Sequence, residues 1–153
     1  MFDKVVEEIK QVLPDFGKHT AVDSKGIKSE CNGKSKRKDK DSRGERDDGT
    51  LWEKIIVWFG YKVHLLVDTK YELPISYEVT KASRPDIEQL IPLVEKAKRS
   101  HPGIEIETLT GDKGYDSKDN VVNLWDDYKI KPVIDIRDMW KDGEKTRALR
   151  HGH

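Results

Sequence analysis

Two stretches of alternating side chains, joined by a short turn, constrain the fold of this chain more than any other feature. Residues 61–68 have apolar side chains at every odd position, whereas Lys62, His64 and Asp68 stand at even positions. This alternation is typical of a strand with one buried face, so we expect His64 at the surface. Residues 73–80 alternate again, and the two stretches together predict an antiparallel hairpin.

The other predicted elements are helices and short strands in alternation. Helices are expected where apolar side chains recur every three or four residues, and strands where short apolar runs lie between turns. The predicted helices cover residues 1–13, 83–100 (with Ser83 as cap) and 117–128 (with Asp116 and Ser117 as cap). The predicted strands cover 20–23, 104–110 and 132–136. Pro92 should kink the second helix because proline has no N–H to donate. This order predicts an α/β fold, with a mixed sheet flanked by helices.

Residues 28–50 differ from the rest of the chain because they hold almost nothing that could be buried. Between Lys34 and Arg46 there are seven basic and three acidic side chains. Without burial to offset the entropy of ordering, we expect an exposed, flexible, basic insertion between the first two strands. No regular element is expected after Met139. The predicted organisation is one domain over residues 1–140 and a disordered tail over 141–153.

The composition restricts the class of protein. At 153 residues the chain fits one domain. Only 35% of the residues are apolar and 38% are charged, which leaves few apolar side chains for a core. Basic and acidic side chains number 29 each, so net charge gives no indication of nucleic-acid binding. The single Cys31 excludes an internal disulfide. No stretch resembles a membrane span or a signal peptide, so we expect a cytoplasmic protein.

Two aspartates are placed where predicted strands end. Asp23 lies in Thr-Ala-Val-Asp-Ser-Lys-Gly-Ile, and Asp112 lies in Leu-Thr-Gly-Asp-Lys-Gly-Tyr-Asp. Aspartate is common in turns and caps for reasons unrelated to catalysis. Carboxylates that a sheet brings together can also hold Mg²⁺ or Mn²⁺ for phosphodiester chemistry. The two aspartates are therefore candidate metal ligands.

Four blocks of the chain carry a family likeness. They read Pro14-Asp-Phe-Gly-Lys-His-Thr-Ala-Val-Asp-Ser-Lys-Gly-Ile27, Trp58-Phe-Gly-Tyr-Lys-Val-His-Leu-Leu-Val-Asp68, Val79-Thr-Lys-Ala-Ser-Arg-Pro-Asp86 and Leu109-Thr-Gly-Asp-Lys-Gly-Tyr-Asp-Ser117. In this order they resemble the DDE transposase domain of bacterial insertion sequences. The resemblance covers nearly the whole chain apart from the basic insertion and about the last dozen residues.

The resemblance implies an RNase H-like fold, in which a hairpin and parallel strands form one mixed sheet flanked by helices. Asp23 and Asp112 would be its first two catalytic residues and the ligands of a two-metal site for Mg²⁺ or Mn²⁺. Such enzymes nick DNA at the ends of the element and then activate the free 3′-hydroxyl for strand transfer. The implied partners are element ends and target DNA in the bacterial nucleoid. A homo-oligomer is one possible assembly.

The chain departs from the family at the third carboxylate. The family has a glutamate there, on a helix after the last strand, in a segment resembling Tyr-Arg-Glu. Beyond Asp135 the sequence contains one glutamate, Glu144, in a polar stretch without a helical apolar stripe, and it ends at His153. We therefore expect a truncated copy that lacks its C-terminal helical part and has reduced or no activity.

Several basic residues are candidate DNA contacts. Lys25 and Lys113 lie close in sequence to the aspartates and could meet phosphate or simply balance charge. The insertion adds four more candidates, which suit a DNA backbone but also an ordinary solvated loop: Lys34, Lys36, Arg37 and Lys38. Besides transposition, the alternatives are a non-enzymatic DNA-binding or transposase-inhibiting remnant, an RNase H-like nuclease for RNA–DNA hybrids, and an unfolded product.

Overall fold

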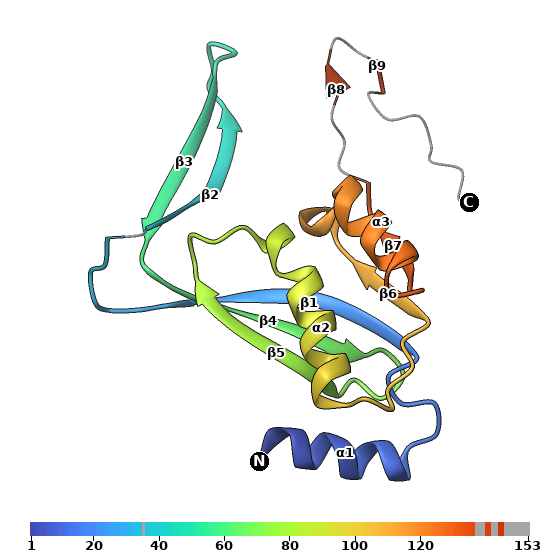
Figure 1. Ribbon diagram of the computed structural model, residues 1–153. Coiled ribbons are helices and arrows are strands. Elements are labelled where there is room, and N and C mark those ends of the chain that lie inside the picture. The colour runs from blue at the N-terminus through green and yellow to red at the C-terminus, as the bar shows by residue number, and fades with distance from the viewer. Residues whose placement is uncertain (35, 137–139, 142–143, 146–153) are drawn as a thin grey trace.

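A five-stranded mixed sheet organises the computed structural model of the chain (Figure 1). The structure describes residues 1–34, 36–136, 140–141 and 144–145. The strands, in spatial order, are β5 (Pro74–Lys81), β4 (Gly60–Asp68), β1 (His19–Lys28), β6 (Thr108–Gly111) and β7 (Lys131–Ile134). β1 pairs antiparallel with β4 and parallel with β6, and β4 pairs antiparallel with β5. The predicted mixed sheet, with its hairpin and its parallel strands, is confirmed.

Helices pack on this sheet. They are α1 (Phe2–Val12), α2 (Leu90–Ser100) and α3 (Lys118–Asp126), with short 3-10 turns η1 (Asp86–Glu88) and η2 (Lys113–Tyr115). Phe2 of α1 packs edge-on against Tyr77, with ring centroids 5.2 Å apart, while α2 contacts β4 and β5. None of the helices in the described part of the chain is long and apolar enough to cross a membrane.

The predicted burial of β4 is wrong. Its even positions are the buried ones, including Lys62, His64 and Asp68, whereas Tyr61 at an odd position is 45% exposed. His64 is therefore in the core rather than at the surface, and its Nε2 lies 2.9 Å from Thr80 Oγ1. The physical reason is that α2 packs on the face that carries the even positions. Lys62, His64 and Asp68 are tolerated there because each makes at least one hydrogen bond.

Asp68 illustrates how a buried charge is stabilised in this fold. Its carboxylate accepts hydrogen bonds from the backbone N–H groups of Gly17 (2.6 Å), Lys70 (2.9 Å) and Tyr71 (2.7 Å). These bonds tie the turn after β4 to the loop that precedes β1. Aspartate is needed here because apolar side chains cannot accept three backbone donors.

Residues 28–50, expected to be an exposed, flexible insertion, contain a strand to which no sequence pattern pointed. β2 (Arg37–Glu45) pairs antiparallel with β3 (Leu51–Trp58), and this hairpin extends away from the main sheet (Figure 1). Its turn closes through Asp48 Oδ1, which accepts from the backbone N–H (2.9 Å) and hydroxyl (2.6 Å) of Thr50. The hairpin is thus held by ladder hydrogen bonds and turn chemistry rather than by burial. The flexibility of this segment stays a prediction.

The start of the second predicted helix differs as well. The helix begins at Leu90, after η1, so Ser83 is not its cap. Pro92 therefore falls in the first turn, where a backbone N–H has no acceptor within the helix, and the reason for a kink disappears. The predicted cap of α3 is confirmed, because Ser117 Oγ accepts a hydrogen bond from the Asn120 N–H at 3.0 Å.

Two short strands lie where no element is expected. β8 (Trp140–Lys141) pairs antiparallel with β9 (Glu144–Lys145), so the prediction of no regular element after Met139 is wrong for these residues. Met139 itself and most of the predicted tail, residues 142–143 and 146–153, lie outside the described residues. A disordered tail therefore stays a prediction.

Burial of β4 against α2 should dominate stability. Leu66 is fully buried, so replacing it with alanine should lower the free energy of unfolding by about 2–5 kcal/mol. Val79 on the neighbouring strand is 51% exposed, and Val79→Ala should cost less than about 1 kcal/mol. Urea denaturation followed by circular dichroism measures both values. Equal costs for the two variants would contradict the assignment of the core.

Candidate active site

Asp23 and Asp112 each follow the last pair of the β1–β6 ladder, but Asp23 lies inside β1, which continues to Lys28, and not at a strand end as predicted. Val22 and Gly111 are the last partners of the β1–β6 ladder, and the next residue on each chain segment is one of the two aspartates. Side chains at matching positions of neighbouring strands point to the same face of a sheet. The pairing therefore directs both carboxylates to one side.

Each carboxylate is exposed and held by one backbone N–H. Ser24 N–H donates to Asp23 Oδ1 at 2.7 Å, and Gly114 N–H donates to Asp112 Oδ1 at 2.7 Å. An ionised carboxylate offers about four lone-pair sites, so a single backbone donor leaves oxygen positions for a cation. The next strand residue orients Asp23, and the η2 turn orients Asp112, without neutralising either carboxylate.

The donor set fits a hard divalent cation. Carboxylate oxygens on a rigid sheet edge suit Mg²⁺ or Mn²⁺, which retain several water ligands when protein donors are few. Among the described residues, however, no three histidine, cysteine, aspartate or glutamate side chains are grouped as a metal site requires. As candidate metal ligands, Asp23 and Asp112 would therefore need further oxygen donors to complete a site.

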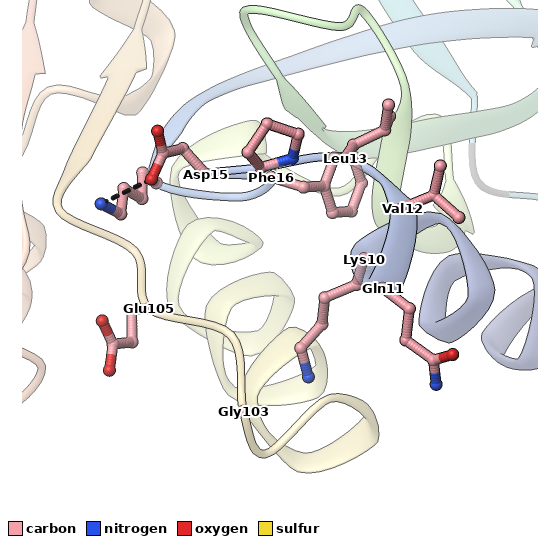
Figure 2. A pocket seen from close by; sticks show the side chains of 10 residues that line it. Lys10, Gln11, Val12, Leu13, Asp15, Phe16, Gly103 and Glu105 are labelled. Carbon is pink, nitrogen blue, oxygen red and sulfur yellow. Dashed lines mark ion pairs between the residues drawn. The ribbon is translucent and has the colours of Figure 1, made fainter.

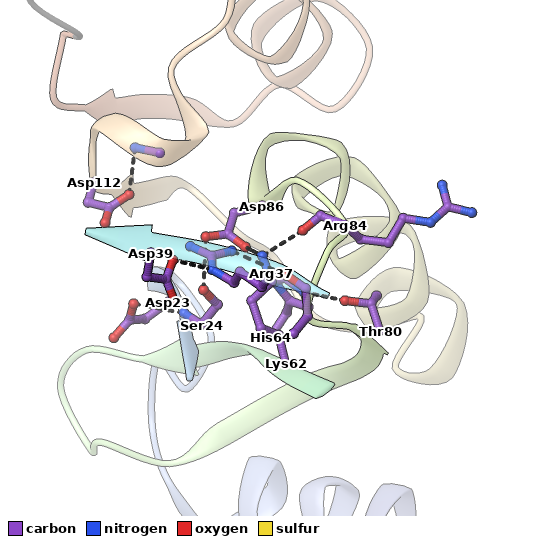
Figure 3. Close-up of polar contacts among 12 residues, drawn as sticks. Asp23, Ser24, Arg37, Asp39, Lys62, His64, Thr80, Arg84, Asp86 and Asp112 are labelled. Carbon is purple, nitrogen blue, oxygen red and sulfur yellow. Dashed lines mark hydrogen bonds and ion pairs between the residues drawn. The ribbon is translucent and has the colours of Figure 1, made fainter. Parts of the chain in front are cut away.

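A polar layer lies behind Asp23, between β1, β4 and η1 (Figure 3). The hydroxyl of Ser24 donates to Asp86 Oδ2 at 3.1 Å, and the ammonium group of Lys62 contacts Asp86 Oδ1. Lys62 is buried and also donates to the Arg84 carbonyl oxygen at 2.5 Å. Sequence analysis overlooked this layer, although Asp86 ends one of the four blocks on which the family likeness rests.

The pKa of the Tyr115 phenol is affected by three acidic side chains of the candidate site. Tyr115 is the last residue of η2, and its side chain is buried next to the Ser24 hydroxyl. Burial raises the pKa of the Tyr115 phenol far above its ordinary value. The negative charges of Asp86, Asp112 and Asp23 raise this pKa further. Because electrostatic effects weaken with distance, the three carboxylates surround one region of the molecule.

The base of the β2–β3 hairpin lies against this region. Arg37 Nε donates to Asp39 Oδ1 at 2.6 Å, and Arg37 also reaches the Ala82 carbonyl oxygen at 3.3 Å. Trp58 Nε1 donates to Asp39 Oδ2 at 2.6 Å. Burial opposes ionisation of Asp39, but the hydrogen bonds from Trp58 and Arg37 outweigh it, so the pKa of Asp39 is lowered. Arg37 is therefore engaged within the protein.

The other predicted DNA contacts have exposed side chains. They are Lys25, Lys34, Lys36, Lys38 and Lys113. Lys113 follows Asp112 directly, and Lys25 lies two residues after Asp23 on the same face of β1. These two lysines are close to the candidate site. The lysines between residues 34 and 38 lead into the hairpin.

A pocket of about 320 Å³ lies elsewhere, near the amino end of β1 (Figure 2). The end of α1 and the loop before β6 line it with Lys10, Phe16, Lys18 and Glu105. Lys18 forms an ion pair with Asp15 there, 2.7 Å from Nζ to Oδ1. The aspartate pair lies at the opposite end of the β1–β6 ladder, so this pocket is separate from the candidate site.

Comparison with known proteins identifies the family. A family model described as "Transposase DDE domain" matches residues 14–153. The chain belongs to the transposase DDE domain family. No curated protein and no solved structure matches it. The matched range includes Asp23, Asp112 and the β2–β3 hairpin. DDE transposase domains act on DNA and generally use divalent metals, so the family agrees with the donor set described above.

The buried histidine of this transposase domain should make its stability depend on pH. Burial lowers the pKa of His64 below its ordinary value of 6.5, and His64 Nδ1 has no hydrogen-bond partner among the described residues. As the pH falls below about 6.5, His64 binds a proton in the unfolded chain but remains neutral in the folded chain. The free energy of unfolding therefore decreases. The free energy of unfolding should be smaller at pH 5.5 than at pH 7.5.

The variant His64→Gln isolates this effect, because glutamine can still bond the Thr80 hydroxyl but does not titrate. Its free energy of unfolding should change less between the two pH values than that of the parent. Urea titrations at both pH values measure the difference. An identical pH dependence in parent and variant would show that His64 does not carry it.

Proposed function

We propose that this chain is the catalytic domain of an insertion-sequence transposase with an RNase H-like fold. In this proposal the domain is of the type that carries out metal-dependent DNA cleavage and strand transfer at the ends of its element, with reduced or no activity in this chain alone. The observation that carries the proposal is the register of β1 against β6, which aligns Asp23 with Asp112. Family membership supports DNA as the substrate, and hence a place at the nucleoid. The strand order β5-β4-β1-β6-β7 is compatible with the fold.

Asp23 and Asp112 would hold Mg²⁺ or Mn²⁺ at the exposed edge of the sheet. When bound, two such ions supply Lewis-acid stabilisation of the attacking and leaving oxygens in an in-line displacement at phosphorus. The chain itself fixes the two carboxylates in one register and orients each through a backbone N–H. Lys25 and Lys113 add positive charge near the path of the DNA backbone.

The third carboxylate belongs, in this proposal, to a helix that packs beside Asp23. The same face of the sheet carries apolar side chains that are 40–52% exposed, namely Ile27, Tyr61, Tyr77 and Val79. An apolar sheet face of this kind favours a further covering element. Without that carboxylate among the described residues, we propose that this chain alone has reduced or no activity.

The lack of a third carboxylate among the described residues leads to a prediction about activity. Incubated with Mg²⁺ and a DNA duplex that carries the ends of its element, this chain should give no strand-transfer product above background. Gel electrophoresis of end-labelled DNA measures nicked and joined products. Robust nicking that requires Mg²⁺ and disappears in Asp112→Ala would contradict the proposed deficiency, while supporting the assignment of Asp112 as a catalytic residue.

DNA binding should depend on the basic segment that leads into the hairpin. Lys34, Lys36 and Lys38 are exposed and can meet phosphates, whereas Arg37 bonds Asp39 and Ala82. We therefore assign the three lysines to the DNA backbone. Arg37 instead anchors the hairpin to the sheet, which is a structural role.

Replacing these three lysines with glutamine should weaken DNA binding and its salt dependence. The slope of log K against log salt should become shallower by about 0.9 for each phosphate that the variant no longer neutralises. Fluorescence anisotropy with labelled duplex at several salt concentrations measures the slope. A matched triple variant of exposed lysines elsewhere, Lys4, Lys129 and Lys131, serves as control. Equal slopes for the two variants would contradict the assignment.

One observation favours a second candidate function. The described residues contain no cluster of three metal-ligating side chains, which suits a non-enzymatic DNA-binding or transposase-inhibiting remnant. Such a remnant would retain salt-sensitive DNA binding and would give no nicking with Mg²⁺ or Mn²⁺. Metal-dependent cleavage of DNA would exclude it.

A further inference from the structure

Ser24 connects the exposed aspartates with the buried polar layer. Along β1, Asp23 pairs with Leu65 and Ser24 pairs with His64, so the side chains of Asp23 and Ser24 point to opposite faces of the sheet. The backbone N–H of Ser24 nevertheless donates to Asp23 Oδ1 at 2.7 Å, while its hydroxyl donates to Asp86 Oδ2 at 3.1 Å. One residue thus touches a carboxylate on each face.

Asp86 is held in place from the other side. Its second oxygen contacts Lys62, whose side chain is 4% exposed and also donates to the Arg84 carbonyl oxygen. A buried ammonium group holds its partner carboxylate in place, since removing either side chain would leave the other without its partner in the interior. Asp86 is therefore a rigid acceptor for the Ser24 hydroxyl.

The usual reason for an aspartate at the start of a helix does not account for Asp86. The residue that caps η1 is Pro85, and the turn has no capping hydrogen bond from a side chain. The carboxylate of Asp86 is directed instead toward β1 and β4, where it meets Ser24 and Lys62 (Figure 3). The feature that distinguishes Asp86 is therefore its contact with β1, the strand that carries Asp23.

We propose that Asp86 is a positioning residue for the metal site. Anchored by Lys62, it holds the hydroxyl of Ser24, so that the backbone N–H of Ser24 keeps the carboxylate of Asp23 oriented toward that of Asp112. Groups that orient metal ligands from behind contribute to metal affinity without contacting the metal. The inference rests on the proposed function, because it assumes that Asp23 and Asp112 bind a divalent metal.

The test measures Mn²⁺ affinity by electron paramagnetic resonance, which counts free Mn²⁺ and needs no catalytic activity. Ser24→Ala and Asp86→Ala should each weaken binding by about tenfold or more. Ser24→Thr keeps the hydroxyl and should bind like the parent. Glu78→Gln is the matched control, since it removes another carboxylate of the sheet that pairs with a lysine, Lys96 of α2. It should also bind like the parent.

A double variant distinguishes coupling from two separate effects. If Asp86 acts through Ser24, the combined Ser24→Ala and Asp86→Ala change should weaken Mn²⁺ binding no more than the stronger single change. Thermal melting checks that each variant is folded. If Asp86→Ala does not fold, the contrast between alanine and threonine at position 24 decides the question, because neither change leaves a buried charge unpaired.

The outcomes separate the two proposals. Mn²⁺ affinity within twofold of the parent for Ser24→Ala overturns the positioning role, and so does an equal loss in Ser24→Thr. If Asp112→Ala abolishes binding in the same experiment, the metal site itself stands. A parent chain that binds no Mn²⁺ overturns both the metal site and the positioning role.

Discussion

The site depends on the double pairing of β1. This strand is antiparallel to β4 and parallel to β6, so it joins the hairpin half of the sheet to the half built from parallel strands. The parallel ladder alone brings Asp112 next to Asp23, across 89 positions of sequence. Strand pairing has a period of two, so a slip of one residue would turn one carboxylate to the opposite face. The candidate metal site therefore exists only in this register.

Polar groups buried under α2 distinguish the interior of this domain from a plain apolar core. Lys62, His64 and Asp68 occupy the inward positions of β4, where desolvation disfavours charge. Lys62 and Asp68 are tolerated because each is paired: Lys62 with a carboxylate and a carbonyl oxygen, and Asp68 with three backbone donors. The contact between Lys62 and Asp86 lies behind Asp23, where a metal site needs rigidity.

Much of the candidate site could be predicted from the sequence, because its signals are local. A β-favouring run followed by aspartate singled out both Asp23 and Asp112. The strand-end position is right for Asp112 but wrong for Asp23, because β1 continues to Lys28. Asp86 could not be assigned in this way, since a proline and an aspartate after serine indicate a helix start whatever the aspartate contacts. The burial of its partner Lys62 could not be predicted either, because a lysine that alternates with apolar residues normally faces water.

The sequence by itself determined the main helices and strands, the β4–β5 hairpin, the cap at Ser117 and the family. Each of these depends on periodicity, turn residues or motifs, which are local features of a sequence. Only the tertiary structure decided which face of β4 is buried, since that depends on where α2 packs. It also decided that a polar segment forms the β2–β3 hairpin, whose stability comes from pairing with another strand. Above all, it decided the contact of Ser24 with Asp86, which joins residues 62 positions apart and has no local signature.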